Sequence, residues 1–147
     1  MSRIVRLGLV GLLAALALAA CGEGEIGGAQ ANFAEEADTV CLEAQDKVGA
    51  TLGDDAVADR DAVRAASDRF MELDPPSEGE TTFEIFRQSV NNLWITLQDI
   101  AQSQEPTVND QARAERARET MRQVNENVKK AADDYGMDAC ARGFGRN

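Results

Sequence analysis

Apolar residues recur every three or four positions in four separate stretches of this chain, and this spacing restricts the possible folds more than any other feature. The third stretch shows the pattern without a gap, in the series Phe83, Phe86, Val90, Leu93, Leu97 and Ile100. Such spacing places the apolar side chains on one face of an α-helix. No stretch alternates between apolar and polar residues with period two, so the sequence predicts an all-α fold without strands.

The other three stretches carry the same kind of apolar stripe. The first contains Phe33, Ala37, Val40, Ala44 and Val48, the second Val63, Ala66, Phe70 and Leu73, and the fourth Ala117, Met121, Val124, Val128, Ala131 and Tyr135. Four amphipathic helices with mostly short connections predict an antiparallel up-down-up-down four-helix bundle over residues 32–147. In that topology the start of the first helix, the 74–80 loop and the end of the fourth helix lie at one end.

Capping residues predict where these helices begin. Asp54 or Asp55 is expected to cap the second helix, because a short acidic side chain accepts the free N–H groups of the first turn. Three further pairs have the spacing of a capping box or of a similar cap, namely Asn32 with Glu35, Thr81 with Glu84, and Thr107 with Asp110.

Glycine and proline predict where the helices end. Gly53 and Gly136 are expected to form left-handed caps, and the apolar Met137 after Gly136 is typical of a Schellman motif. Pro75 and Pro76 are expected to end the second helix, since neither residue donates a backbone hydrogen bond.

The first twenty residues have the layout of an export signal. Arg3 and Arg6 precede a stretch from Leu7 to Ala20 that contains only Leu, Val, Gly and Ala. A positive start followed by a short apolar segment is typical of a secretory signal peptide. The apolar part has about 14 residues, fewer than the ~20 that span a bilayer as a helix. We therefore expect residues 1–20 to be removed rather than kept as a transmembrane anchor.

The end of this signal, Leu18-Ala19-Ala20-Cys21, resembles the lipobox of bacterial lipoproteins. The resemblance implies cleavage before Cys21 and attachment of a diacylglycerol to its thiol. The alternative is an ordinary secretory signal that a cysteine follows by chance. The lipobox predicts an exported protein that lipid on Cys21 holds at the outer face of the bacterial cell membrane. Residues 21–31, which are rich in glycine, are expected to form a flexible tether.

The acidic balance of the chain excludes nucleic acid as a partner. The chain has 26 acidic and 15 basic residues and a formal charge of −11, and loss of residues 1–20 removes only basic charge. Binding phosphates requires clustered Lys and Arg side chains, which this chain lacks.

The three cysteines fit the lipoprotein interpretation. If Cys21 is alkylated, Cys41 and Cys140 remain in a compartment that permits disulfides. Pairing them closes a loop of about 100 residues, which the chain-entropy model values at ~4–5 kcal/mol of stability. The alternative is two separate buried thiols. We expect the disulfide.

The chain shows no constellation of catalytic residues. It contains no histidine, which removes the commonest general base and the commonest metal ligand near neutral pH. No glycine-rich phosphate loop follows a strand, and Cys41 and Cys140 are too far apart in sequence for a redox pair. Carboxylate pairs are the one catalytic option that this composition retains. We expect no enzymatic activity, no cofactor and no metal.

Acidic residues crowd two places where helices are expected to meet turns. These residues are Asp54, Asp55, Asp59 and Asp61 at one turn, and Asp133 and Asp134 near the end of the fourth helix. Calcium binding is one interpretation, because Ca²⁺ takes several carboxylate oxygens. The spacing does not fit an EF-hand loop, however, and one of these residues already serves as a cap. We favour a solvated acidic turn.

Trp94 and Tyr135 are the single members of their residue types. Trp94 adjoins Leu93 on the third helix, where it either flanks the core or belongs to an exposed binding patch. Core packing is the preferred interpretation. Tyr135 continues the stripe of the fourth helix, so we expect a buried ring with an exposed hydroxyl.

The whole pattern resembles a loose group of small, mostly uncharacterised helical lipoproteins of actinobacteria. Besides the lipobox, the shared features are Ala37-Asp38-Thr39-Val40-Cys41, Pro75-Pro76 and Gly136-Met137-Asp138-Ala139-Cys140. The resemblance implies the helical fold and the pairing of Cys41 with Cys140. It implies no activity.

Three functional hypotheses follow. The first is a non-enzymatic binding or interaction module of the cell envelope, which holds a protein or a small ligand. The second is a structural or stress-related envelope lipoprotein, and the third an enzyme with a site built only from carboxylates. A pocket with converging polar groups favours ligand binding, and an exposed apolar patch favours a protein partner.

Overall fold

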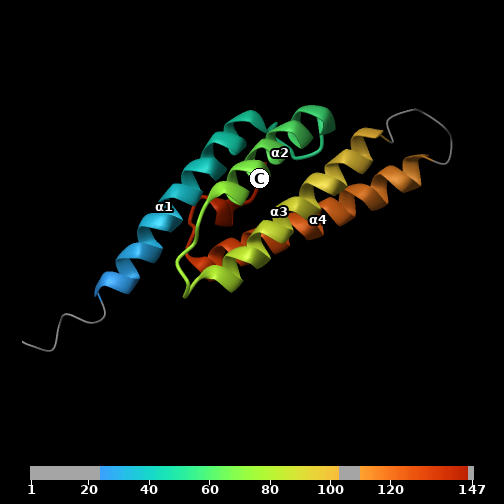
Figure 1. Cartoon of the computed structure of the whole chain (residues 1–147). Helices are drawn as coiled ribbons and strands as arrows, with labels where there is room; N and C mark the ends of the chain where they lie inside the picture. The colour runs from blue at the N-terminus through green and yellow to red at the C-terminus, as the bar shows by residue number, and fades with distance from the viewer. Residues whose placement is uncertain (1–23, 103–109, 146–147) are drawn as a thin grey trace, which may run out of the picture.

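A computed structural model describes residues 24–102 and 110–145 of the chain, and in these ranges it is all-helical. Its elements are α1 (Gly24–Lys47), α2 (Ala56–Glu72), α3 (Glu80–Gln102), α4 (Asp110–Tyr135) and a short 3-10 helix, η1 (Cys140–Arg142). The four long helices run alternately in opposite directions along one axis (Figure 1). α2 packs against α1 and α3, and α3 packs against α4. The antiparallel up-down-up-down bundle is confirmed.

The two ends of the bundle are connected as this topology requires. Gln30 near the start of α1 donates its side-chain N–H to the carbonyl oxygen of Tyr135 at the end of α4, at 3.3 Å. Gly79, in the turn before α3, lies directly against the Tyr135 ring. The start of α1, the α2–α3 turn and the end of α4 therefore share one end of the molecule (Figure 1).

The predicted tether over residues 21–31 is wrong in its second part, because α1 already begins at Gly24. Residues 21–23 lie outside the described residues. Ala29 to Ala31 are strong helix formers, and the hydrogen bond of Gln30 to Tyr135 gives this turn a tertiary contact. Asn32 consequently lies within the helix and does not cap it.

The other three predicted helix starts have different outcomes. α3 begins at Glu80, and the Gly79 carbonyl oxygen accepts the N–H of Phe83 at 2.9 Å, so Thr81 lies in the first turn rather than at the cap. Asp55 caps α2 as predicted, because its carboxylate accepts the N–H of Ala58 at 3.1 Å. The cap predicted at Thr107 lies outside the described residues.

The predicted helix ends are mostly confirmed. Gly136 adopts a φ of 90°, and the N–H of Met137 reaches back to the carbonyl of Ala132 at 2.9 Å, which is the Schellman motif. α2 ends at Glu72, before the two prolines. Gly53 has a φ of 91°, but it lies in the turn before α2 and not at the end of α1.

The core consists of the predicted stripes. All members of the first and third stripes are buried, and so are Val63, Ala66 and Phe70 of the second. In the fourth stripe Ala117 and Val124 are only partly buried. Near the end that carries the α2–α3 turn, aromatic rings pack together, and the edge-to-face pair Phe33 and Phe83 has centroids 4.7 Å apart. Each such buried ring contributes ~1.5–3 kcal/mol of stability relative to an exposed one.

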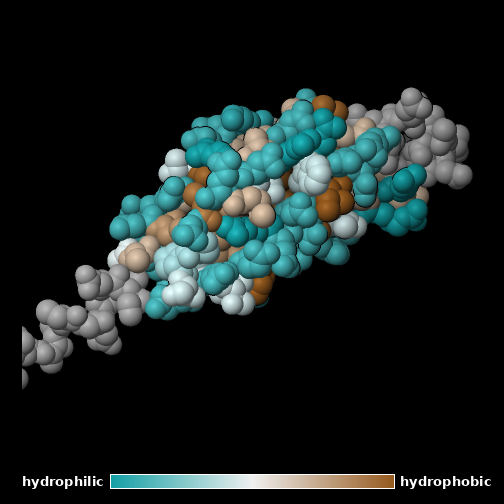
Figure 2. All heavy atoms as spheres, in the orientation of Figure 1, coloured by the Kyte–Doolittle hydropathy of each residue, from teal (hydrophilic) through white to brown (hydrophobic). Residues whose placement is uncertain are grey.

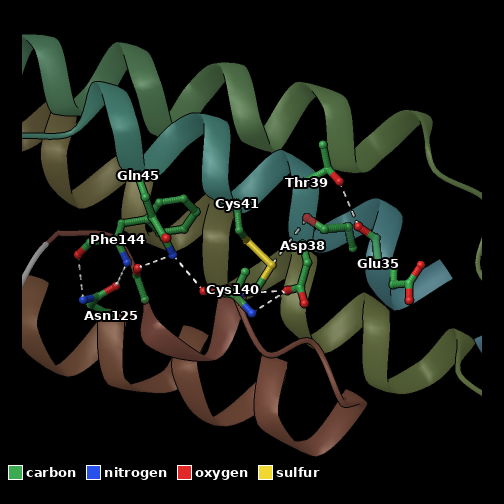
Figure 3. Close-up of a disulfide and its surroundings, with 11 residues drawn as sticks. Glu35, Asp38, Thr39, Cys41, Gln45, Asn125, Cys140 and Phe144 are labelled. Carbon is green, nitrogen blue, oxygen red and sulfur yellow. Dashed lines mark hydrogen bonds between the residues drawn. A yellow bond between two sulfur atoms is a disulfide. The ribbon is translucent and has the colours of Figure 1, made fainter. Parts of the chain in front are cut away.

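The segment after α4 folds back and lies between α4 and α1 (Figure 3). It carries η1, the buried Phe144 and Cys140, which forms a disulfide with Cys41 of α1 across a Cα–Cα distance of 5.2 Å. The predicted disulfide is thereby confirmed. The bundle is closed between α1 and α4 by this C-terminal segment, which the helical stripes alone do not indicate.

Candidate functional site

Of the predicted site residues, the structure describes Cys41 and Cys140. Cys41 and Cys140 are bonded to each other and almost wholly buried. Cys21 lies outside the described residues, so lipid attachment there stays a prediction. The cysteine pair closes the fold and is inaccessible to a ligand.

Polar side chains hold the C-terminal segment around the disulfide (Figure 3), and of these the sequence analysis named only Asp38, as part of a motif and without a role. Asp38 accepts the N–H groups of Ala139 and Cys140. Gln45 donates to the carbonyl oxygens of Ala139 and Gly143, at 2.8 and 2.9 Å.

Asn125 of α4 completes this arrangement. It exchanges two hydrogen bonds of 3.1 Å with the backbone of Phe144, one as donor and one as acceptor. The side chains that hold the segment are occupied by the protein's own backbone. These side chains stabilise the fold, and their hydrogen-bonding groups are not free to bind a ligand.

The acidic residues around the start of α2 include one buried carboxylate, Asp59 in the first turn of the helix. Asp59 is fully buried and accepts the N–H of Gly49 at 2.9 Å and that of Gly53 at 2.6 Å. Asp54, Asp55 and Asp61 are exposed. The solvated-turn interpretation is thus correct for three residues and wrong for Asp59. Among the described residues no group of three or more acidic or cysteine side chains is arranged to hold a metal ion.

Trp94 is partly buried at the flank of the core, with the guanidinium of Arg64 5.7 Å from its ring centroid. Tyr135 is buried, and its hydroxyl, which we expected to be exposed, is buried too. Burial raises the pKa of the Tyr135 phenol, because the charged phenolate loses its hydration. Neither aromatic residue forms an open binding patch.

A surface groove of about 890 Å³ lies at the turn between α2 and α3. We call it the α2–α3 groove. Its apolar lining residues are Met71, Leu73, Pro75 and Ile85, its acidic ones are Glu72, Asp74, Glu80 and Glu84, and Thr81, Arg87 and Gln88 complete it. Both helices contribute, since α2 ends and α3 begins here. The face that Figure 2 shows is mostly hydrophilic, with scattered apolar patches.

Arg87 is the one basic residue of the α2–α3 groove, and the protein itself occupies its guanidinium. It donates to the carbonyl oxygen of Phe70 at 2.9 Å and to that of Leu73, which lack helical partners at the end of α2. It also lies 3.6 Å from a Glu84 carboxylate oxygen and 4.8 Å from the Phe83 ring centroid. Arg87 thus joins the end of α2 to the start of α3.

The apolar lining of the α2–α3 groove is unusually exposed. Met71 is 65% exposed and Ile85 is 54% exposed, the two highest values among the exposed large apolar side chains of the described residues. Both lie in the same groove. Clustered exposed apolar surface marks interaction sites in soluble domains, whereas single exposed apolar residues are ordinary. The arrangement is suited to noncovalent binding.

Sequence reasoning missed this groove for a physical reason. Met71 and Ile85 lie outside the core stripes of α2 and α3, so the helical period assigns them to the surface without placing them side by side. Only the antiparallel pairing of the two helices brings them to one groove. The signal present in the sequence was an apolar residue on the polar face of each of two consecutive helices, close to their shared turn.

No family model, curated protein or solved structure matches this chain. Among the helices of residues 24–102 and 110–145, none is long and apolar enough to cross a membrane.

Proposed function

We propose that this protein is an envelope lipoprotein, held by lipid on Cys21 at the outer face of the bacterial membrane, which works as a non-enzymatic binding module. The observation that carries the binding role is the convergence of Met71 and Ile85, the two most exposed large apolar side chains of the described residues, in one groove rimmed by carboxylates. The α2–α3 groove is the proposed binding site.

Two features support the proposed location in the cell envelope. The Cys41–Cys140 disulfide agrees with an exported protein, because disulfides persist in oxidising compartments. Removal of residues 1–20 and acylation of Cys21 account for the odd number of cysteines.

In this proposal the bundle lies close to the anchor, because α1 begins early in the chain. Gly24 follows Cys21 by only three positions, and three extended residues reach at most ~10 Å. The end of the bundle that carries the α2–α3 turn is the end where α1 begins. In this proposal the groove lies near the membrane surface, and α1 holds the bundle in place of a flexible tether.

Lipid attachment is tested by mass spectrometry of the protein isolated from membranes. We expect the N-terminal peptide to begin at an acylated Cys21 and the variant C21A to leave the membrane fraction. The variant C41A/C140A is the control, since it should remain membrane-bound. An unmodified N-terminus elsewhere in the chain contradicts the anchor.

The binding role is tested by site-specific photo-cross-linking in the native envelope. A photoreactive residue replacing Ile85 in the α2–α3 groove should give a discrete cross-linked species. The same residue at Ile95, which is 44% exposed on α3 and outside the groove, is the matched control. Equal products from both positions, or none from Ile85, contradict the proposed site.

A further inference from the structure

The charges of the α2–α3 groove indicate which kind of partner it takes. Glu72, Asp74 and Glu80 line the groove and form no ion pair with any described residue. Glu84 is shared between Arg87 and the side chain of Gln88, which donates to it at 3.2 Å. The groove therefore presents uncompensated negative charge to a ligand.

The groove does not fit an anionic partner. The guanidinium of Arg87 is occupied by two backbone carbonyls and by Glu84, so it is not free to bind phosphate or carboxylate. The surrounding carboxylates repel anionic headgroups as well. Nucleic acid and anionic lipid are excluded from this groove on the same ground.

The apolar part of the groove fits a side chain rather than a simple cation. Met71 has a flexible, polarizable thioether that adapts to differently shaped partners, and Ile85 faces the same groove from α3. A metal ion gains nothing from these two side chains, whereas an aliphatic or aromatic residue of a partner buries them.

From this combination we propose that the α2–α3 groove binds a short protein segment in which Lys or Arg residues flank an aliphatic or aromatic residue. The proposal rests on the proposed binding function and names the chemistry of its partner. The basic side chains pair with Glu72, Asp74 and Glu80, and the apolar residue packs between Met71 and Ile85. Because the charges are exposed, binding is expected to weaken at high salt.

The probe is a capped peptide of alternating Lys and Leu residues, which carries both required features. Two further peptides, alternating Lys with Ser and Glu with Leu, each lack one of them. Binding is measured by fluorescence anisotropy to the full protein in phosphatidylcholine nanodiscs, whose lipids carry no net charge. We expect the Lys–Leu peptide to bind most tightly and the Glu–Leu peptide not to bind.

Charge variants locate the site. The variant E72Q/D74N/E80Q is expected to weaken binding of the Lys–Leu peptide about tenfold, since it removes three exposed charge pairs. The matched control is E36Q/D46N/D133N, which removes the same charge from exposed positions outside the groove and is expected to change Kd less than twofold. Equal losses in both variants overturn the proposal, because they indicate general electrostatic attraction.

Apolar variants test the second feature. M71Q/I85Q should weaken the Lys–Leu peptide several-fold and leave the Lys–Ser peptide unchanged, whereas I95Q should affect neither. Equal affinities of the two Lys peptides for the unmodified protein overturn the apolar contact. So does a methyl NMR signal of Met71 that responds to nanodisc lipid but not to the peptide, since that identifies a membrane contact.

The two sets of experiments distinguish a wrong partner from a wrong binding role. If a photoreactive residue at position 85 gives a specific product while no Lys–Leu peptide binds the groove, the binding module stands and the basic partner is wrong. If neither cross-linking nor peptide binding depends on the groove, both proposals fail.

Discussion

Oδ1 of Asp38 accepts the backbone N–H of Cys140 at 2.9 Å, one turn of α1 before the cysteine to which Cys140 is bonded. The same oxygen accepts the N–H of Ala139 at 2.8 Å. Asp38 therefore fixes the backbone of the C-terminal segment in the position where the disulfide to Cys41 forms. The Asp-x-x-Cys spacing in α1 has a structural explanation, because one helical turn places both side chains on the same face.

Because Asp38 accepts both N–H groups through one oxygen, we expect its replacement by Asn to be tolerated. In D38N the remaining carbonyl oxygen can still accept both N–H groups, so only the charge is lost and stability should fall by about 1 kcal/mol or less. D38A leaves both N–H groups without this acceptor and should cost ~2–4 kcal/mol. Urea unfolding measures both values. The exposed neighbour variant D138N should stay within about 0.5 kcal/mol of the original protein.

Asp59 is predicted to respond in the opposite way, because it uses both oxygens. Its Oδ1 accepts the N–H of Gly49 and its Oδ2 that of Gly53, so the amide group of D59N must turn a donor toward one of these donors. We expect D59N to cost ~2–4 kcal/mol, clearly more than D38N. The control D54N, at an exposed position in the turn before α2, should be nearly neutral. Equal urea midpoints for D38N and D59N contradict this reading of the two carboxylates.

The helices and their buried faces could be predicted from the spacing of apolar residues. The positions where the helices begin could not. The stripe from Phe83 to Ile100 specifies both a helix and its buried face, because apolar burial dominates the free energy of a bundle. The helix starts at Gly24 and Glu80 differ from the predicted starts, because α1 extends further toward the N-terminus, where Gln30 contacts Tyr135, and the backbone bonds of α3 already begin at Gly79.

The candidate site was the part of the molecule that the sequence predicted least well. Asp54 in the turn before α2 and Asp59 in the first turn of α2 are the same residue type, yet Asp54 is exposed and Asp59 is buried. Only the path of the backbone decides this. The α2–α3 groove is lined by both Met71 and Ile85, which lie on two different helices. Periodicity within one helix carries no information about such a pair.

The disulfide is predicted to be a structural and not an exchangeable bond. Its two cysteines are separated by 99 positions and are each only 1% exposed. Alkylation of the native protein should label neither Cys41 nor Cys140, and reduction should require unfolding first. C41A/C140A should lose ~4–5 kcal/mol in the chain-entropy model, measured by urea unfolding. Labelling of both cysteines without reductant or denaturant contradicts the pairing.

The stability of the protein is predicted to depend on the ionisation of Tyr135. The tyrosinate signal can be assigned to this residue, because the chain has one tyrosine. Burial raises the pKa of its phenol, so the unfolded chain ionises first as the pH passes about 10. The stabilising effect is complete below that pH and is lost as the pH rises through the folded-state pKa. Ultraviolet titration of the tyrosinate should show a midpoint above that of the urea-unfolded protein.

The variant Y135F is the control for that titration. It lacks the ionising group, so its free energy of unfolding should fall less than that of the original protein between neutral and alkaline pH. At neutral pH it should be as stable or up to ~1 kcal/mol more stable, because the hydroxyl has no hydrogen-bond partner among the described residues. A large loss of stability in Y135F contradicts the buried, unpaired hydroxyl.

The contact between Gly79 and Tyr135 connects the core to the α2–α3 groove. A Cβ atom at Gly79 would lie 2.5 Å from Cε2 and 2.6 Å from the hydroxyl oxygen of Tyr135. The ring cannot easily move, because it packs against Phe33 and Phe83 with centroids 5.5 and 5.7 Å away. G79A should therefore cost ~1–3 kcal/mol through overpacking. G28A, where a Cβ meets nothing within 4 Å, should be neutral or stabilising.

Replacing Tyr135 tests whether the ring causes this cost. In Y135L the clash is relieved, so G79A should cost less in the Y135L background than in the original protein. Y135F should give a smaller relief, because it removes the hydroxyl contact and keeps the Cε2 contact. Gly79 also precedes Glu80, the first residue of α3 and a lining residue of the groove. G79A should accordingly weaken binding of the Lys–Leu peptide, because displacing the start of α3 moves a carboxylate of the groove. Equal costs of G79A in all three backgrounds would show that the ring is not what holds Gly79 in place.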